Sequence, residues 1–238
     1  MTVTDTAGDA SVHQGHGAVP ATQPDHGAHQ GHGTSAGAQD GAAGHTGPAD
    51  IVIDHTGHAV LPAQGSGSYV RREVVYSVPS ASLRDQAARP VTLAAALDHD
   101  GPLLLNFIFT SCSTICPVMS ATFGEVQPDL AALGADYRMV SITIDPEYDT
   151  PSRLRDYAGL HDAQPQWIFL TGDTAEIRKV IAAFDAIYQA DNKMYHLPYT
   201  YLRAAPGQPW VRFEGLLSGA ELVEEYRSVL ASQPAKLN

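Results

Sequence analysis

The sequence predicts an α/β protein in which helices flank a mixed central sheet, and three observations support this class. Strand-like and helix-like hydrophobic patterns alternate from residue 69 onward. The continuous apolar run over 103–109 is typical of a strand that is buried on both faces in a parallel or mixed sheet. Near the end of the chain a hairpin pattern precedes a closing helix, which fits helices packed on such a sheet.

The first half of the domain contains three of the expected strands. The segment 70–78 is strand-like, and the segment that begins at Pro90 leads into a short helix, Leu93–Leu97. The buried strand 103–109 precedes a helix, and Pro117 suits the first turn of that helix because a missing N–H costs nothing there. Pro128 should end or kink the same helix. The next strand is expected over 137–144.

The second half continues the alternation. A helix is expected from Thr150-Pro151 to 161, and a strand over 167–170. Asp173 and Glu176 have the spacing of a capping box, which predicts the next helix, and Ser218 and Glu221 have it before the last helix. Between these two helices, 199–203 and 210–213 are expected to pair as strands.

By composition the 238 residues divide into an extension, 1–66, and a domain, 67–238. The extension is a low-complexity segment rich in Gly, Ala and His. It lacks the apolar surface that would offset its ordering entropy, so we expect it to be disordered and flexible. Within it, 51–62 predicts two short strands about a turn at Thr56-Gly57.

The charge distribution excludes one class of function. The net charge is −12, and no Lys or Arg precedes Arg71, so the basic patch that nucleic-acid binding needs is missing. No apolar run is long enough to span a bilayer. The N-terminus lacks the basic start and apolar stretch of a signal peptide, so the residues alone predict a cytoplasmic chain or a processed or truncated form.

Eight of the eleven histidines precede residue 60, and most of them recur at a spacing of three. The spaced histidines are His13, His16, His26, His29, His32, His55 and His58. Because His-rich tracts often bind metal and imidazole suits copper, zinc and nickel, the extension is expected to bind metal weakly and with low selectivity. The alternative is a polar leader whose histidines have no specific role.

The chain has two cysteines, Cys112 and Cys116, in a Cys-x-x-x-Cys-Pro motif between the buried strand and the following helix. Thiols near a helix N-terminus tend to ionise, and thiolates attack disulfides and bind soft metals such as Cu(I). At this spacing in a helical turn their Cα atoms lie roughly 6 Å apart, which allows either a disulfide or a shared metal ion. A structural disulfide or two inert thiols is the plainer alternative. With this pair after a central strand, a thioredoxin-like fold is expected.

A third ligand would make the copper site trigonal, and His196 is the candidate because it precedes the expected strand 199–203. His99 and His161 are its rivals within the domain. From the residues alone, an ordinary half-buried histidine remains the alternative for His196.

The domain resembles the Sco/SenC family of copper-binding proteins. The resemblance covers roughly 69–230 and is carried by Phe-Ile-Phe-Thr-Ser-Cys-Ser-Thr-Ile-Cys-Pro-Val-Met-Ser (107–120), Ser-Ile-Thr-Ile-Asp-Pro-Glu-Tyr-Asp-Thr-Pro (141–151) and Trp-Ile-Phe-Leu-Thr-Gly (167–172). It ends with a histidine followed five and six residues later by Tyr201-Leu202.

The resemblance implies a thioredoxin-like fold and one copper ion, Cu(I) or Cu(II), held by Cys112, Cys116 and His196. It also implies a role in assembling the dinuclear copper site of cytochrome c oxidase, by delivering copper, reducing that site's cysteines, or both. The implied partners are the oxidase's copper-site subunit or another cuproprotein, together with other copper chaperones or thiol reductants. Such proteins are mostly membrane-tethered and face the periplasm or intermembrane space.

Two features near His196 differ from the family pattern. Tyr195 stands where an aspartate commonly precedes the ligand histidine, which affects how the imidazole is oriented. Pro198 follows by two residues and is a candidate for the cis-proline of thioredoxins.

Asp145 and Asp149 are expected to form a turn and a helix cap rather than to bind metal.

Two main functions therefore remain open, and a copper or redox sensor without catalysis is a weaker third. The first is a metallochaperone for copper. The second is a thiol–disulfide oxidoreductase in which Cys112 attacks and Cys116 resolves, so that the chain reduces the cysteines of a copper-site partner.

Overall fold

The protein is an α/β structure, as predicted, in this computed structural model. The structure describes residues 69–134, 136–186 and 192–232, together with the backbone of 52–53, 59–60 and 64–65. The expected extension lies largely outside these residues, and the expected boundary at 66–67 falls outside them as well.

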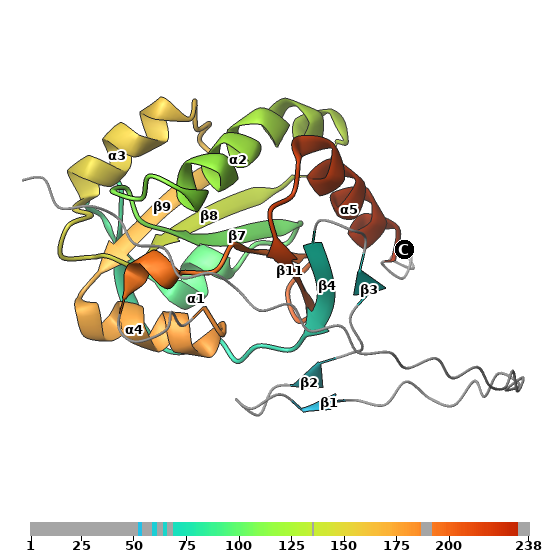
Figure 1. The fold of residues 1–238 in the computed structure, drawn as a ribbon, viewed down its shortest axis with the longest axis horizontal. Coiled ribbons are helices and arrows are strands. Elements are labelled where there is room, and N and C mark those ends of the chain that lie inside the picture. The colour runs from blue at the N-terminus through green and yellow to red at the C-terminus, as the bar shows by residue number, and fades with distance from the viewer. Residues whose placement is uncertain are drawn as a thin grey trace, which may run out of the picture. The chain divides into compact units, whose positions relative to one another are not determined.

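One mixed sheet organises the described part of the chain (Figure 1). Its order is β1-β2-β4-β11-β10-β7-β8-β9-β5-β6, and β3 pairs with β4. The strands are β1 (Val52–Ile53), β2 (Ala59–Val60), β3 (Gln64–Gly65), β4 (Tyr69–Val74), β5 (Ser82–Asp85), β6 (Pro90–Thr92), β7 (Leu103–Ile108), β8 (Arg138–Thr143), β9 (Trp167–Gly172), β10 (Tyr199–Arg203) and β11 (Trp210–Gly215). The strands β1 and β2 form the short antiparallel pair expected over 51–62.

Helices cover both faces of this sheet (Figure 1). They are α1 (Leu93–Leu97), α2 (Ile115–Ala132), α3 (Pro151–Leu160), α4 (Thr174–Ala183), α5 (Gly219–Ala231) and the 3₁₀ turn η2 (Lys193–Tyr195). The view shows α2, α3 and α5 on one side, with α1 and α4 on the other. This placement follows from the connections, because β7, β8 and β9 are parallel neighbours and right-handed crossovers put α2 and α3 on the same face.

The strand β7 is the centre of the sheet and is buried along its whole length. It pairs in parallel with β8, where Ile108 lies opposite Thr143. It pairs antiparallel with β10, where Thr200 lies opposite Asn106. The end of β7 and the start of β10 therefore meet at one edge of the sheet, and the two segments that carry Cys112 and His196 leave the sheet there.

Pro128 does not end α2, because the helix continues through it to Ala132. Proline lacks the N–H that would bond to the carbonyl four residues earlier, at Gly124. That carbonyl instead accepts a hydrogen bond from the Gln127 side-chain amide at 3.2 Å. The unpaired acceptor is thus satisfied locally, and the helix is not broken.

The two expected capping boxes had different outcomes. Ser218 and Glu221 form one, with both reciprocal hydrogen bonds present. Asp173 is the N-cap of α4, but its side chain makes no capping hydrogen bond. Glu176 accepts instead from the Ser82 amide of β5 at 3.0 Å, so its carboxylate anchors a strand that the sequence did not predict.

Candidate functional site

The two cysteines lie in the turn that joins β7 to α2. The Cys112 amide donates to the Phe109 carbonyl at 3.1 Å and closes the turn, while Cys116 is the second residue of α2. Both are free thiols, and the exposed fraction is 7% for Cys112 and 0% for Cys116. The structure therefore brings the predicted pair together as a buried dithiol.

The surroundings separate the pKa values of the two thiols. Burial raises the pKa of Cys112, but hydrogen bonds from Thr114 and from the Cys116 amide and thiol outweigh burial and leave that pKa below its usual value. Burial raises the pKa of Cys116, and the nearby charges of Cys112 and Asp149 raise it further. Cys112 is therefore the thiol that ionises first, which suits it to attack or to bind a metal first.

A buried carboxylate, that of Asp149, is hydrogen-bonded to the residues just before Cys112. Asp149 has no exposed surface, and it accepts hydrogen bonds from the Thr110 hydroxyl at 2.5 Å and the Thr110 amide at 3.1 Å. The Thr143 hydroxyl donates to the same carboxylate at 2.5 Å. Burial raises the pKa of Asp149 even though these donors oppose it. The N-cap of α3 is Thr150 and not Asp149, whose carboxylate instead anchors the residues before Cys112.

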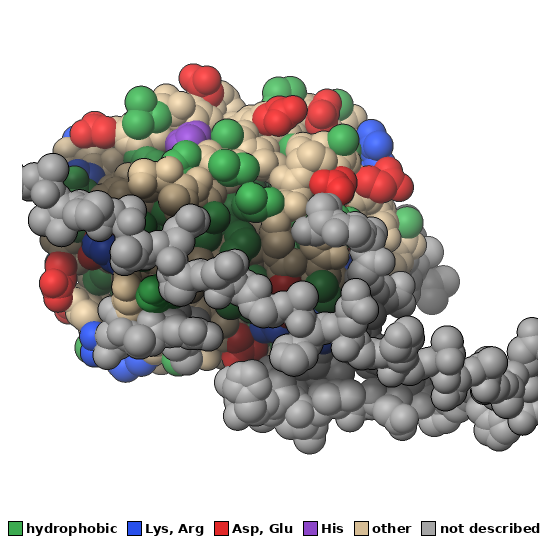
Figure 2. Space-filling view, in the orientation of Figure 1, with side chains coloured by type: hydrophobic (Ala, Val, Ile, Leu, Met, Phe, Trp, Pro, Cys, Tyr) green, Lys and Arg blue, Asp and Glu red, His purple; other side chains and the backbone are tan. Residues whose placement is uncertain are grey.

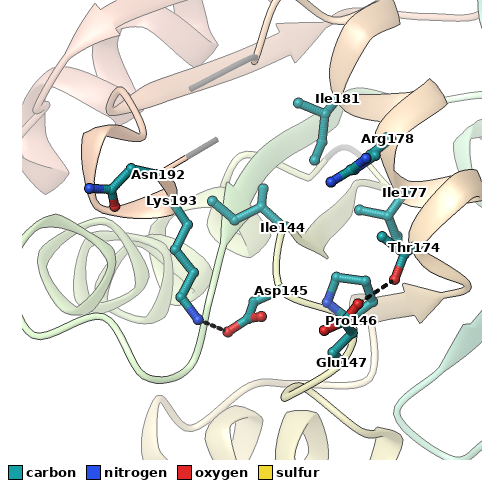
Figure 3. Close-up of a pocket in the computed structure, with 10 residues that line it drawn as sticks. All are labelled: Ile144, Asp145, Pro146, Glu147, Thr174, Ile177, Arg178, Ile181, Asn192 and Lys193. Atoms are coloured by element: carbon teal, nitrogen blue, oxygen red, sulfur yellow. Dashed lines mark hydrogen bonds and ion pairs between the residues drawn. The ribbon is translucent and has the colours of Figure 1, made fainter. Parts of the chain in front are cut away.

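A pocket of about 360 Å³ lies between α4, the loop after β8 and η2 (Figure 3). Its apolar lining includes Ile144, Ile177 and Ile181. On one side the Lys193 side chain reaches across to Asp145 and forms an ion pair with it (Figure 3). The Lys193 ammonium also lies 5.4 Å from the centroid of the Phe109 ring. The expected turn role of Asp145 is thus accompanied by a contact to the segment that carries His196.

The His196 side chain is buried without a polar partner. Only 4% of the residue is exposed, and neither ring nitrogen has a hydrogen-bond partner in the described structure. Burial lowers the pKa of His196 to about 4. The imidazole is therefore neutral near pH 7, which is the form that binds metals. Buried polar groups are almost always satisfied, so an unpaired imidazole at this edge of the sheet calls for an explanation.

The described conformation does not gather the three predicted ligands into a metal site. In the part of the chain that the structure covers, no group of three or more His, Cys, Asp or Glu side chains is arranged to hold a metal ion. His196 belongs to the segment that leads into β10, beside the end of β7, and the two cysteines lie in the turn that follows β7. The donor types themselves, two thiols and a neutral imidazole, fit copper.

The rival histidines have other contacts. His99 Nε2 lies 3.1 Å from the Asp136 carbonyl oxygen, and the centroids of the His161 and Tyr157 rings lie 4.6 Å apart.

Tyr195 is exposed, so it gives the His196 ring no buried partner. No cis peptide bond occurs in the described residues, so the interpretation of Pro198 as a cis-proline was wrong.

Hydrophobic side chains are exposed around the site residues in sequence. They are Val118, Met194, Tyr195 and Leu197, and each has roughly half of its surface exposed. Figure 2 shows hydrophobic side chains gathered on the face where α2 lies in Figure 1, with acidic side chains toward the edges.

Sequence reasoning missed two residues of this region, Lys193 and Thr110. Lys193 had one usable signal, since it lies three residues before the candidate histidine. Thr110 had none, because a threonine after a buried strand has no periodic or spacing pattern that points to Asp149.

The fold and the buried dithiol define a protein of the thioredoxin-like class, with the two thiols after a central strand and a buried histidine at the same edge. Comparison with known proteins identifies the group within this class. The SCO1/SenC family model matches residues 80–231, and the chain belongs to this family.

Known relatives agree with this assignment. The SCO1 protein homolog of Bacillus subtilis (strain 168) is 30% identical over 156 residues, which cover 63% of this chain and 80% of that protein. BsSco, a member of the Sco family of cytochrome c oxidase assembly proteins in which a disulfide switch has been identified, is 28% identical. The structure of BsSco superposes on this one with a TM-score of 0.55, and the match covers 66% of this chain and 95% of BsSco. The crystal structure of Arabidopsis thaliana ScoI with copper bound is 26% identical, with a TM-score of 0.52, covering 63% of this chain and 98% of that chain.

These likenesses confirm the thioredoxin-like fold and the resemblance to the Sco/SenC family. In the described residues, no helix has the length and apolar character needed to cross a membrane.

Proposed function

We propose that this chain is a copper metallochaperone that binds one copper ion through Cys112, Cys116 and His196. In this role it assists assembly of the dinuclear copper site of cytochrome c oxidase. The observation that carries the proposal is the buried His196 ring, whose two nitrogens have no hydrogen-bond partner among the described residues and which lies at the sheet edge where the dithiol also lies. A copper ion would satisfy one of these nitrogens. Membership of a family that includes a copper-bound relative supports the choice of metal.

The chemistry of the residues supports a soft metal. Thiolates prefer Cu(I), and a neutral imidazole adds a third donor without adding charge. Burial keeps the pKa of His196 at about 4, so no proton has to leave this side chain at neutral pH. Cys116 has a raised pKa and must lose its proton on binding, so copper uptake should release protons and weaken as the pH falls.

A second function is favoured by the separated pKa values of the two thiols. Cys112 as the thiolate would attack a partner disulfide and form a mixed disulfide. Cys116, after losing its proton, would attack Cys112 of that mixed disulfide, so the partner leaves with two thiols and the chain keeps the disulfide. A thiol reductant would then have to restore the dithiol. This reaction would prepare the cysteines of a copper-site partner.

The family also suggests partners and a location. We expect the copper-site subunit of cytochrome c oxidase or another cuproprotein to receive copper, and other copper chaperones or thiol reductants to serve the chain. The exposed Val118, Met194, Tyr195 and Leu197 provide apolar surface for such contacts. A periplasmic or periplasm-facing membrane-associated location fits these partners.

The His-rich extension fits the same function as a local store of copper. Its histidines lie outside the described residues, so this proposal rests on their spacing in the sequence. At limiting copper, the full chain should load its thiol site faster than a chain whose early histidines are replaced. Equal loading would count against a store.

The test of the proposed site needs a background without these histidines. We define the leader-substituted chain as the full chain with asparagine in place of His13, His16, His26, His29, His32, His45, His55 and His58. Copper stoichiometry and affinity would be measured on the reduced protein without oxygen, in competition with a chromophoric Cu(I) chelator. One tight copper should bind, and Cys116→Ala or His196→Ala should abolish or greatly weaken it, whereas the control His99→Ala should not.

Retention of one tight copper after Cys116→Ala would overturn the proposed site. The oxidoreductase function has a separate test, because it needs both cysteines but not the histidine. If His196→Ala reduced a partner disulfide at the wild-type rate while copper binding was lost, the thiol–disulfide function would be favoured.

A further inference from the structure

In the described structure, residues 192–197 have one long-range polar contact, which comes from Lys193, and the next residue, Pro198, accepts from the Gly215 amide at 3.0 Å. The Lys193 ammonium pairs with Asp145, which lies 48 positions earlier in the chain, and Figure 3 shows the side chain spanning the gap between η2 and the loop after β8. The same ammonium lies over the Phe109 ring. Because the Phe109 carbonyl accepts the Cys112 amide, Lys193 touches a residue that also holds the cysteine turn.

The other described contacts of residues 192–197 are local. The Met194 amide donates to the Asn192 side chain at 3.0 Å, and the His196 amide donates to the Lys193 carbonyl at 3.1 Å. Met194, Tyr195 and Leu197 are largely exposed, so they contribute little packing. Among the described residues the buried His196 ring has no polar partner, which costs free energy and favours release of the segment. The Lys193 contacts oppose that release.

Asp145 in turn is connected to the cysteine turn. Its amide donates to the Thr143 hydroxyl oxygen at 2.9 Å, and the Thr143 hydroxyl donates to Asp149 at 2.5 Å. Asp149 accepts from the amide and hydroxyl of Thr110, two residues before Cys112. A continuous series of polar contacts therefore joins Lys193 to the residues that position the first cysteine, and such buried networks hold their members in one arrangement.

We propose that Lys193 is a positioning residue, whose ion pair with Asp145 holds the His196 segment against the cysteine turn and thereby strengthens copper binding. The copper part rests on the proposed function, whereas the positioning part does not. A segment held near its bound position loses less freedom when the metal binds, so the affinity rises. Both partners of the ion pair are partly shielded, since 38% of the Lys193 side chain and 14% of the Asp145 side chain are exposed.

The first test measures how firmly the segment that carries His196 is held in the metal-free full chain. Backbone amide hydrogen exchange over residues 192–197 should quicken in Lys193→Met and in Asp145→Asn, and it should stay near the wild-type rate in the conservative Lys193→Arg. The matched control is Lys179→Met, which removes another lysine–carboxylate pair, the one with Glu176 on α4. Unchanged exchange in Lys193→Met would overturn the proposal.

The second test measures Cu(I) affinity in the leader-substituted chain. Lys193→Met should weaken binding about fivefold, as expected for a partly exposed ion pair of about 1 kcal/mol. Lys179→Met should leave the affinity unchanged, and Lys193→Met combined with Asp145→Asn should be no weaker than Lys193→Met alone, because the two changes remove one interaction.

The outcomes separate this proposal from the proposed function. If exchange quickens but copper binds as tightly or more tightly in Lys193→Met, the claim that this contact strengthens binding is wrong. If exchange quickens and the parent chain binds no tight copper, the proposed function fails and the positioning role of Lys193 stands.

Discussion

The Asp149 carboxylate accepts both the amide and the hydroxyl of Thr110, at 3.1 Å and 2.5 Å, although the two residues are 39 positions apart. This contact fixes the chain just before Cys112 to the start of α3. The arrangement of the dithiol thus depends on a carboxylate that does not belong to the Cys-x-x-x-Cys motif.

The variant Asp149→Asn should therefore destabilise the protein by about 2 kcal/mol, because an amide cannot accept from all three donors and brings a buried donor of its own. Urea unfolding of the reduced, metal-free protein measures this loss. The control is Asp173→Asn, whose side chain makes no capping hydrogen bond, and it should change the unfolding free energy by about 0.5 kcal/mol or less. Equal effects of the two changes would show that the Thr110 contact does not matter.

The buried His196 predicts a specific dependence of stability on pH. Its pKa is about 4 in the folded protein and near 6.5 when unfolded, so between these values the unfolded chain binds a proton that the folded one does not. Stability should be fully present above pH 6.5 and be lost as the pH falls toward 4, by up to about 3 kcal/mol from this residue. Chemical unfolding of the metal-free protein at several pH values measures this.

The variant His196→Gln should remove that part of the pH dependence, whereas His99→Gln should retain it. A wild-type slope that persists in His196→Gln would mean that the buried imidazole is not its source.

The two thiols should differ in reactivity. Cys112 has the lowered pKa and Cys116 the raised one, and only the thiolate is alkylated rapidly. At neutral pH, iodoacetamide should modify Cys112 at least about tenfold faster than Cys116. The rates would be measured on Cys116→Ala and Cys112→Ala respectively, and they should become equal in denaturant. Faster reaction of Cys116 in the folded protein would contradict the assigned environments.

Two helical glycines should respond in opposite ways to alanine. A Cβ at Gly124 would lie 2.7 Å from the His161 carbonyl oxygen, whereas Gly159 has open space around it. Gly124→Ala should lower the unfolding free energy by about 1–3 kcal/mol, because α2 could no longer approach His161 so closely. Gly159→Ala should raise it by up to about 1 kcal/mol through helix propensity. Stabilisation by both changes would mean that α2 and His161 are not in close contact.

The sequence predicted those parts of the fold that depend on interactions between residues close together in the chain. The apolar run that became β7 and the capping box of Ser218 and Glu221 needed only local sequence. The capping box of Asp173 did not form and α2 did not end at Pro128, because side chains that no local pattern points to decided both outcomes. The Glu176 carboxylate accepts a hydrogen bond from the Ser82 amide, 94 positions away. The Gly124 carbonyl accepts one from the Gln127 side-chain amide.

The candidate site divides in the same way. The spacing of Cys112 and Cys116 predicted a dithiol, which the structure has. The His196 ring is buried and has no hydrogen-bond partner among the described residues because of how the loop before β10 packs. No periodic pattern in the sequence predicts the packing of that loop. The Lys193–Asp145 contact joins two loops that come together only when β8 and β10 lie on either side of β7.

The most direct measurement of the central claim is X-ray absorption at the copper edge on the leader-substituted chain loaded with one Cu(I). Our account predicts a first coordination sphere of two sulfur atoms and one nitrogen, and the loss of the nitrogen in His196→Ala. Coordination by nitrogen and oxygen alone, or a two-sulfur sphere that is identical in wild type and His196→Ala, would contradict it.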